Sequence, residues 1–279
     1  MPLRPALLAL TVVVVWGVNF VVIDEGLQGI PPLLFAAIRF VLVALPAVFF
    51  VPRPQAPWTA VAAIGLTMSA GQFGFLYLAL KVGMPPGLAS LVLQSQVVVT
   101  VVLAALLLRE HVSARQVIGL ATGVLGLVVV GLGRSAATPA LGVLLTVAAA
   151  ASWAVGNVRT RTLGLRGGLP LVVWSALVVP IPLLLVSLAV EGPGSWVDAW
   201  HAWGWRQSGS TAYTVVLSTL FGYGVWNSLL ARHQASRVVP FALLVPVFGI
   251  GAAWLVQGSY PGVAELLGGL VLLAGAGLT

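Results

Sequence analysis

Long apolar runs alternate with short polar or turn-forming connections over the whole chain. A run of about 20 residues with few charges is long enough to cross a bilayer as a helix. The pattern therefore predicts ten transmembrane helices, at residues 4–23, 31–51, 57–80, 86–108, 114–133, 139–159, 169–190, 209–231, 238–257 and 261–279. We expect an all-α integral membrane protein.

Polar side chains interrupt the fourth run, LASLVLQSQVVVTVVLAALLL, near its middle. Gln94, Ser95 and Gln96 would lie inside the hydrocarbon, where an amide or hydroxyl without a partner is costly. These groups must therefore face another helix or a wet cavity. Two interpretations remain open: the helix forms part of a pathway wall, or the glutamines join neighbouring helices by hydrogen bonds.

Composition supports the membrane class and removes other classes. Hydrophobic residues make up 60% of the chain and charged residues 7%, and a water-soluble domain of 279 residues does not have such values. The net charge of +7 has a use in setting membrane topology, so we expect a lipid bilayer and no nucleic acid as partner. The chain has no cysteine, which excludes disulfides and thiolate metal sites.

Basic residues are unevenly distributed over the predicted connections. With a cytoplasmic N-terminus, nine lie on inner connections and three on outer ones, as the positive-inside rule requires. The inner set is Arg4, Arg53, Arg109, Arg115, Arg159, Arg161, Arg166, Arg232 and Arg237, and the outer set is Lys81, Arg134 and Arg206. An even number of spans then places the C-terminus in the cytoplasm as well.

One connection, residues 191–208, is long and contains WVDAWHAWGW. Tryptophan rings favour the headgroup region, so the segment predicts a short helix that lies on the membrane surface. A role for these tryptophans in substrate binding is the alternative.

The chain also repeats itself at an offset of about 150 residues. Leu93 aligns with Leu243 and Gln96 with Pro246, and the pair Gly119/Gly126 aligns with Gly268/Gly275; Trp16 and Trp153 lie in similar segments. A repeat of five spans must place its second copy upside down. We therefore predict two inverted five-helix repeats, residues 1–136 and 137–279, around a central cavity.

Several motifs in order carry a family resemblance: WGVNF in the first span, IRF in the second, LREHVSARQVIGLATGVLGLVVVG around the fifth, and the proline of the ninth. Nearly the whole chain resembles the EamA branch of the drug/metabolite transporter superfamily, and most of all its YddG-type exporters of aromatic amino acids. The resemblance implies export of metabolites from the bacterial cell through a cavity lined by spans one, three, four, six, eight and nine. Glu110 matches the family pattern, but Ser259 and Tyr260 stand at its counterpart, so a paired role for this acid is in doubt.

Aromatic and amide side chains recur on the same faces of the predicted helices. Trp16 and Asn19 are three residues apart, and Trp153 and Asn157 are four apart, so each pair shares one face. Such walls suit a small zwitterion or an aromatic metabolite, although ordinary membrane packing is the alternative for each ring. The predicted substrate-binding residues are Trp16, Asn19, Gln72, Tyr77, Gln94, Gln96, Trp153, Asn157, Tyr223, Trp226 and Asn227. Pro246 should kink the ninth span and act as a hinge.

Arg39 lies within the second predicted span, where a guanidinium is expensive. Asp24 and Glu25 at the outer end of the first span could be its charge partners in a structural clamp. Two other possibilities remain open: the side chain reaches to the membrane surface, or it attracts a substrate carboxylate.

The sequence points to a secondary exporter and not to an enzyme. No Asp or Glu lies in the middle third of a predicted span, which disfavours tight proton coupling through a buried carboxylate. Neither a P-loop nor an HExxH motif is present, so we expect no catalytic residue, metal or cofactor. We expect a monomer in the bacterial inner membrane that exports amino acids, aromatic or otherwise apolar, by alternating access. The alternatives are an exporter of another small metabolite or drug, a channel, and an intramembrane enzyme.

Overall fold

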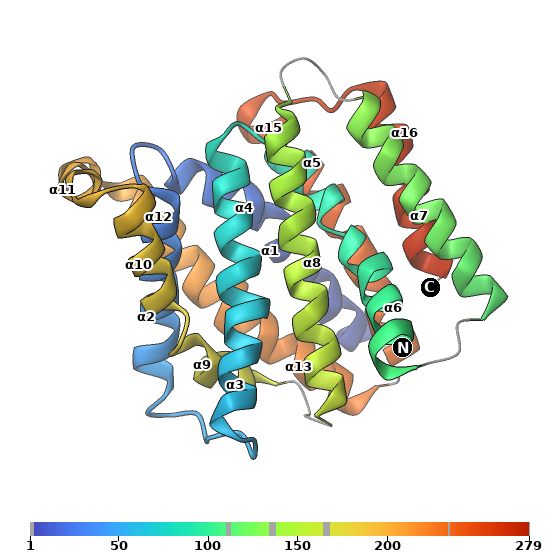
Figure 1. The fold of residues 1–279 in the computed structure, drawn as a ribbon, viewed down its shortest axis with the longest axis horizontal. Coiled ribbons are helices and arrows are strands. Elements are labelled where there is room, and N and C mark those ends of the chain that lie inside the picture. The colour runs from blue at the N-terminus through green and yellow to red at the C-terminus, as the bar shows by residue number, and fades with distance from the viewer. Residues whose placement is uncertain (1–2, 110–112, 134–137, 164–167, 234, 279) are drawn as a thin grey trace.

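The computed structural model describes residues 3–109, 113–133, 138–163, 168–233 and 235–278, and within these ranges every regular element is a helix. Figure 1 shows the helices as one bundle, with both chain ends in the lower right of the view. The expectation of an all-helical protein is thus confirmed for the described residues.

The elements follow one another as a series of straight and interrupted helices. The first part of the chain contains α1 (Leu3–Gly26), α2 (Pro32–Ala47), α3 (Trp58–Ile64), the π-helix η1 (Gly65–Gly71), α4 (Gln72–Lys81), α5 (Pro86–Val92), α6 (Ser95–Leu108) and α7 (Ala114–Gly133). The second part contains α8 (Ala140–Thr162), α9 (Leu169–Ala176), α10 (Pro180–Val190), α11 (Pro193–Ala202), α12 (Trp205–Ala212), the π-helix η2 (Tyr213–Phe221), α13 (Gly222–Arg232), α14 (Ala235–Val238), the 3-10 helix η3 (Val239–Leu244), α15 (Val245–Gln257) and α16 (Val263–Leu278). Proline occupies the first turn of α2, α5 and α15, where its missing N–H is not needed.

Four helical stretches are long and apolar enough to cross a membrane: Leu3–Gly26, Trp58–Lys81, Pro86–Leu108 and Ala140–Thr162. The pair α9 and α10 is a fifth if its bend of 42° lies within one span, and α2, α15 and α16 are shorter apolar helices. The chain is therefore a multi-pass membrane protein. The count of ten crossings stays a prediction.

The predicted fourth span is broken where the polar residues stand. Helix α5 ends at Val92 and α6 begins at Ser95, and backbone bonds from Gln96 N to Leu93 O (3.1 Å) and from Val97 N to Gln94 O (3.0 Å) tighten the turn between them. A similar break lies about 150 residues later, where η3 ends at Leu244 and α15 begins.

In each π-helix, a backbone carbonyl accepts a hydrogen bond from a side chain on a helix that is far away in the sequence. Ser152 Oγ on α8 donates to the carbonyl of Thr67 in η1 (2.8 Å), and Trp16 Nε1 on α1 donates to the carbonyl of Ser218 in η2 (2.9 Å). A wider helical turn weakens the regular backbone ladder, so a carbonyl there is free to accept such a bond. Helix α1 in the first part of the chain is thus bonded to η2 in the second part, and α8 in the second part is bonded to η1 in the first.

Helices α7 and α16 pack backbone to backbone through glycines. A Cβ on Gly126 would collide with the backbone of Gly268 and Leu272, and a Cβ on Gly275 would collide with the backbone of Gly119 and Gly123. Close approach of this kind is what small residues allow between membrane helices. Figure 1 shows the two helices side by side at the right edge of the bundle.

The N-termini of α7 and α16 are capped in related ways. The side chain of Gln116 accepts from the backbone N of Ser113 (3.0 Å), and the side chain of Glu265 accepts from the backbone N of Gly262 (2.7 Å). Both residues stand three positions after the residue that they bond, as in a capping box.

The long connection does contain the short helix predicted for it. Helix α11 lies at the left edge of Figure 1, and the ring of Trp200 on it is 81% exposed. Trp196 Nε1 donates to Ser187 Oγ (2.9 Å), and Ser187 also bonds Glu191, whose carboxylate accepts from the backbone N of Leu33 (2.9 Å) at the start of α2. A carboxylate at a helix N-terminus is favourable. Whether α11 lies on the membrane surface stays a prediction.

Candidate functional site

An aromatic cluster forms where α1 meets η2 and α13. The ring of Trp16 lies 5.3 Å from that of Tyr223 and 5.2 Å from that of Trp226, both in tilted geometry. The indole N–H of Trp16 is held by the Ser218 carbonyl, which fixes the orientation of the ring. Three predicted site residues thus meet, although they come from helices about 200 residues apart in the chain.

Two predicted amides meet at the start of α6. Asn157 Nδ2 on α8 donates to Gln96 Oε1 (3.1 Å), and Thr100 Oγ1 approaches the same oxygen (3.4 Å). Gln94 Nε2 donates to the carbonyl of Ala242 in η3 (2.9 Å), so this residue joins the two broken helices. The structure shows the interhelical hydrogen bonds of the second interpretation. Whether the helix also forms a pathway wall stays a prediction.

Several polar atoms at the centre are buried without a partner among the described residues: Asn19 Oδ1, Gln72 Oε1 and Ser95 Oγ. Asn19 is 6% exposed and Gln72 is 4% exposed. An unsatisfied polar atom in the interior is costly, so each one requires an explanation, and a bound ligand would be one. The role of Asn19 and Gln72 in substrate binding stays a prediction.

The remaining predicted residues lie on the same elements with fewer specific contacts. Trp153 on α8 is partly buried against the main apolar core. Asn227 on α13 is partly exposed and has no hydrogen bond within the described residues. Pro246 is buried in the first turn of α15, directly after the 3-10 helix, so the interruption of the ninth predicted span lies beside it.

Arg39 is 2% exposed, so its side chain does not reach the surface. Nη2 donates to Thr219 Oγ1 (2.9 Å), and Nη1 donates to Tyr77 Oη over a longer 3.3 Å. The guanidinium carbon also lies 4.2 Å from the centre of the Phe73 ring. Within the described residues no carboxylate forms an ion pair with Arg39, so the expected clamp with Asp24 or Glu25 is not what holds it.

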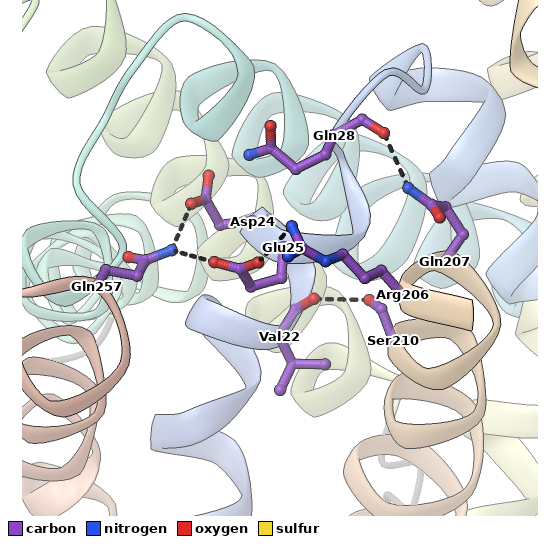
Figure 2. A network of polar contacts seen from close by, with 8 residues as sticks. All are labelled: Val22, Asp24, Glu25, Gln28, Arg206, Gln207, Ser210 and Gln257. Atoms are coloured by element: carbon purple, nitrogen blue, oxygen red, sulfur yellow. Dashed lines mark hydrogen bonds and ion pairs between the residues drawn. The ribbon is translucent and has the colours of Figure 1, made fainter. Parts of the chain in front are cut away.

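Asp24 and Glu25 instead belong to a network at the C-terminal end of α1. Figure 2 shows Gln257 Nε2 between them, at 2.7 Å from Asp24 Oδ2 and 3.2 Å from Glu25 Oε1. Arg206 Nη1 lies 3.7 Å from Glu25 Oε2. The two acids therefore join the end of α1 to the last residue of α15 and to the first turn of α12.

Two further bonds extend the same network along α12. Gln207 Nε2 donates to the carbonyl of Gln28 (2.8 Å), and Ser210 Oγ donates to the carbonyl of Val22 (2.7 Å). We call the residues drawn in Figure 2 the α1 end network. It joins the C-terminal end of α1 to α12 and α15.

A small cavity of about 100 Å³ lies apart from the predicted residues. Its walls come from the start of α5, the end of α15 and the segment before α16, and Tyr260 and Glu265 contribute to them. None of the predicted substrate-binding residues lines this cavity. Glu265 Oε1 accepts from Thr138 Oγ1 there (3.1 Å), so its carboxylate is already engaged. Glu110 lies outside the described residues.

Sequence reasoning missed Thr219, Phe73 and Ser218 as neighbours of the predicted residues. Thr219 and Ser218 lie in η2, within the run YTVVLSTLF, where nothing distinguishes them from other small polar residues of a membrane helix. Phe73 could have been found, because it lies one turn before Tyr77 on the same face.

Comparison with known families gives two matching segments over almost the whole chain. The model of the EamA-like transporter family matches residues 3–132 and residues 140–279. The two matched segments cover nearly the same residues as the two predicted repeats, whose inverted arrangement stays a prediction.

Curated relatives are similar over nearly their full length. A protein of Salmonella typhimurium named "Probable amino-acid metabolite efflux pump" is 43% identical over 278 residues, covering 98% of this chain and 93% of the relative. A protein of Escherichia coli with the same name is 41% identical, with the same coverage of both chains. The "Uncharacterized transporter YvbV" of Bacillus subtilis is 31% identical over 97% of this chain and 89% of its own.

A solved structure titled "Crystal structure of protein" superposes with a TM-score of 0.67. It covers 99% of this chain and 95% of its own at 21% identity. This likeness supports the fold alone.

Proposed function

Since this chain belongs to the EamA-like transporter family, we propose that it exports amino acids from the bacterial cell as a secondary transporter. The observations that carry the proposal are the aromatic cluster where α1 meets α13 and the amide pair between α6 and α8. The names of the two most similar relatives described above point to the same class of substrate. The YddG-type preference for aromatic side chains is part of the proposal.

The two parts of the chain act as inverted repeats in this proposal. Support comes from contacts that recur under the repeat offset. Gly126 packs on Gly268, and the equivalent residues 149 positions away, Gly275 and Gly119, pack on each other in the same way. The paired π-helices and the paired breaks before α6 and α15 follow the same relation.

The bundle would sit in the inner membrane with both termini in the cytoplasm. The excess of arginine on one set of connections supports this orientation. With it, the α1 end network lies on the outer side, where Lys81 also donates to the carbonyls of Leu27 and Ile30 (both 3.3 Å). In this proposal the structure is a state whose outer end is held together by these bonds.

Export requires this outer end to open while the inner end closes. The α1 end network consists of hydrogen bonds and one exposed ion pair, which can separate at modest cost. The breaks before α6 and α15 provide places to bend, with Pro246 at the second of them.

Substrate would bind where the rings and unsatisfied amides lie. The side chain of the amino acid would pack against Trp16 and Trp153, and the amides of Asn19, Gln72 and Gln96 would orient its polar groups. Its entry would displace existing contacts such as the Gln96–Asn157 hydrogen bond.

Transport by purified protein in liposomes tests this function. Saturable, stereoselective uptake within an amino-acid panel, with counterflow by unlabelled substrate, is the expected result. Uptake of other metabolites or drugs alone would replace the substrate class. Single-channel currents would indicate a pore, and chemical conversion of the substrate would indicate an enzyme.

A further inference from the structure

Arg39 carries a permanent charge inside the bundle. It stands seven residues after Pro32 at the start of α2, about 10 Å along the helix axis. A guanidinium is not deprotonated in proteins, so burial cannot remove its charge. A buried charge without a counter-charge is strongly unfavourable unless something compensates for it.

The contacts of Arg39 leave most of its donors unused. The guanidinium has five N–H donors, of which the described contacts engage one on Nη1 and one on Nη2. The Nε atom is buried and without a partner among the described residues. Both partners are neutral hydroxyls, on Tyr77 and Thr219, and the rings of Phe73 and Phe40 supply only cation–π contact at 4.2 and 5.5 Å.

Arg39 reaches the same segment of η2 that holds the central aromatic cluster. It bonds the side chain of Thr219, and Trp16 bonds the carbonyl of the preceding residue, Ser218. The Tyr77 hydroxyl is both a partner of Arg39 and a predicted substrate contact. The cation therefore lies beside the site proposed for the substrate, and α2 itself packs against α4 and η2.

We infer that Arg39 is the subsite for the carboxylate of the exported amino acid, an inference that rests on the proposed function. A carboxylate can accept two parallel N–H bonds from a guanidinium, a geometry that the two hydroxyls do not provide. Its negative charge would supply the missing counter-charge in a medium of low dielectric constant. Substrates that keep the carboxylate should then bind much better than amines that lack it.

Thr219 acts as the positioning residue for this subsite. Its hydroxyl accepts from Arg39 Nη2 and donates to the carbonyl of Thr214 (2.7 Å), which fixes the direction of its lone pairs. Thr219→Val keeps the volume of the side chain and removes this support. We expect it to reduce the preference for carboxylates while leaving the fold intact.

The test uses three probes with the same ring: L-phenylalanine, 3-phenylpropanoate, which lacks the amine, and phenethylamine, which lacks the carboxylate. Their affinities for purified wild-type protein are measured by calorimetry. We expect 3-phenylpropanoate to bind at least about tenfold better than phenethylamine. Arg39→Gln should abolish this preference, Arg39→Lys should retain part of it, and Lys81→Gln, at the end of α4, should leave it unchanged.

The outcomes separate this inference from the transport function. Wild-type protein that transports amino acids but does not prefer 3-phenylpropanoate overturns the carboxylate subsite alone. The same holds if folded Arg39→Gln keeps the wild-type preference, because a merely structural arginine would lower the affinity of all three probes equally. If Arg39→Gln does not fold, Thr219→Val and Arg39→Lys are compared with the wild type instead. A reduced preference for 3-phenylpropanoate over phenethylamine in both variants supports the subsite, and the wild-type preference in both overturns it. Wild-type protein that transports no amino acid overturns both proposals.

Discussion

Helices α7 and α16 form a close-packed pair, whereas the region between α1, α4, α8 and η2 has several buried polar atoms. In the α7–α16 pair, glycine lets the two backbones touch, so there is little room for a change in their packing. In the central region, π-helical carbonyls accept bonds from side chains, and Asn19, Gln72 and Arg39 each have a buried atom without a described partner.

This difference in packing assigns a supporting role to α7 and α16 and a binding role to the polar region. A pair held by backbone contact along its length resists bending, so α7 and α16 suit a fixed scaffold. A region with unsatisfied polar groups is less stable than it could be, and such strain is tolerated where a ligand relieves it. Substitutions that affect one region and not the other test this assignment.

The largest effect on stability is expected at the glycine contact. Gly126→Ala places a Cβ against the backbone of Leu272, which cannot move away without separating the helices. The cost is about 2 kcal/mol or more. Gly251→Ala in α15 is the control, since a Cβ there meets nothing within 4 Å. Melting temperature in detergent should fall for the first variant only; equal behaviour would show that α7 and α16 do not pack tightly.

The next effect concerns the bond between α1 and η2. Trp16→Phe removes the N–H that the Ser218 carbonyl accepts, and we expect a loss of about 1 kcal/mol together with weaker transport. Trp226→Phe is the matched control, because its indole N–H has no hydrogen bond within the described residues. Melting curves and transport rates measure both. Identical losses in the two variants would assign the effect to ring size.

A smaller effect is expected for the amide pair. Gln96→Leu and Asn157→Leu each break the bond between α6 and α8, so a double-mutant cycle should give a coupling energy of about 0.5–1.5 kcal/mol in stability. Additive effects in the cycle would mean that the two amides do not interact.

The smallest effect is expected at the α1 end network. Arg206 and Glu25 form an ion pair at 3.7 Å with side chains 56% and 36% exposed, and such pairs contribute little. Arg206→Ala should therefore change the free energy of unfolding by less than about 0.5 kcal/mol. A larger loss in chemical denaturation would show that this end is locked more firmly than its geometry suggests.

Much of the helical layout follows from the sequence, because apolar runs and turn residues act locally. The spans predicted at 4–23 and 139–159 correspond to α1 and α8, and the polar interruption of the fourth span marks a real break in the helix. Trp16, Tyr223 and Trp226 were all predicted as substrate-binding residues, and the structure brings their rings together.

Other features depend on contacts that form only after folding. The π-helices η1 and η2 accept hydrogen bonds from Ser152 and Trp16. No local sequence pattern predicts either π-helix. The partner of Arg39, Thr219, is 180 residues away, so sequence proximity favoured Asp24 and Glu25 instead. Those acids bond Gln257, which is more than 230 residues away.

Transport of L-phenylalanine and L-alanine by wild type and by Trp16→Ala, Trp153→Ala and Gln96→Leu tests the central claim most directly. The tryptophan variants should lose about tenfold or more for phenylalanine and much less for alanine, because only the larger side chain packs against the rings. Gln96→Leu should weaken both substrates to a similar extent, since it removes a polar group that orients the shared backbone atoms. If all three variants are well folded and transport both substrates at the wild-type rate and affinity, the central site does not exist and these residues serve packing alone.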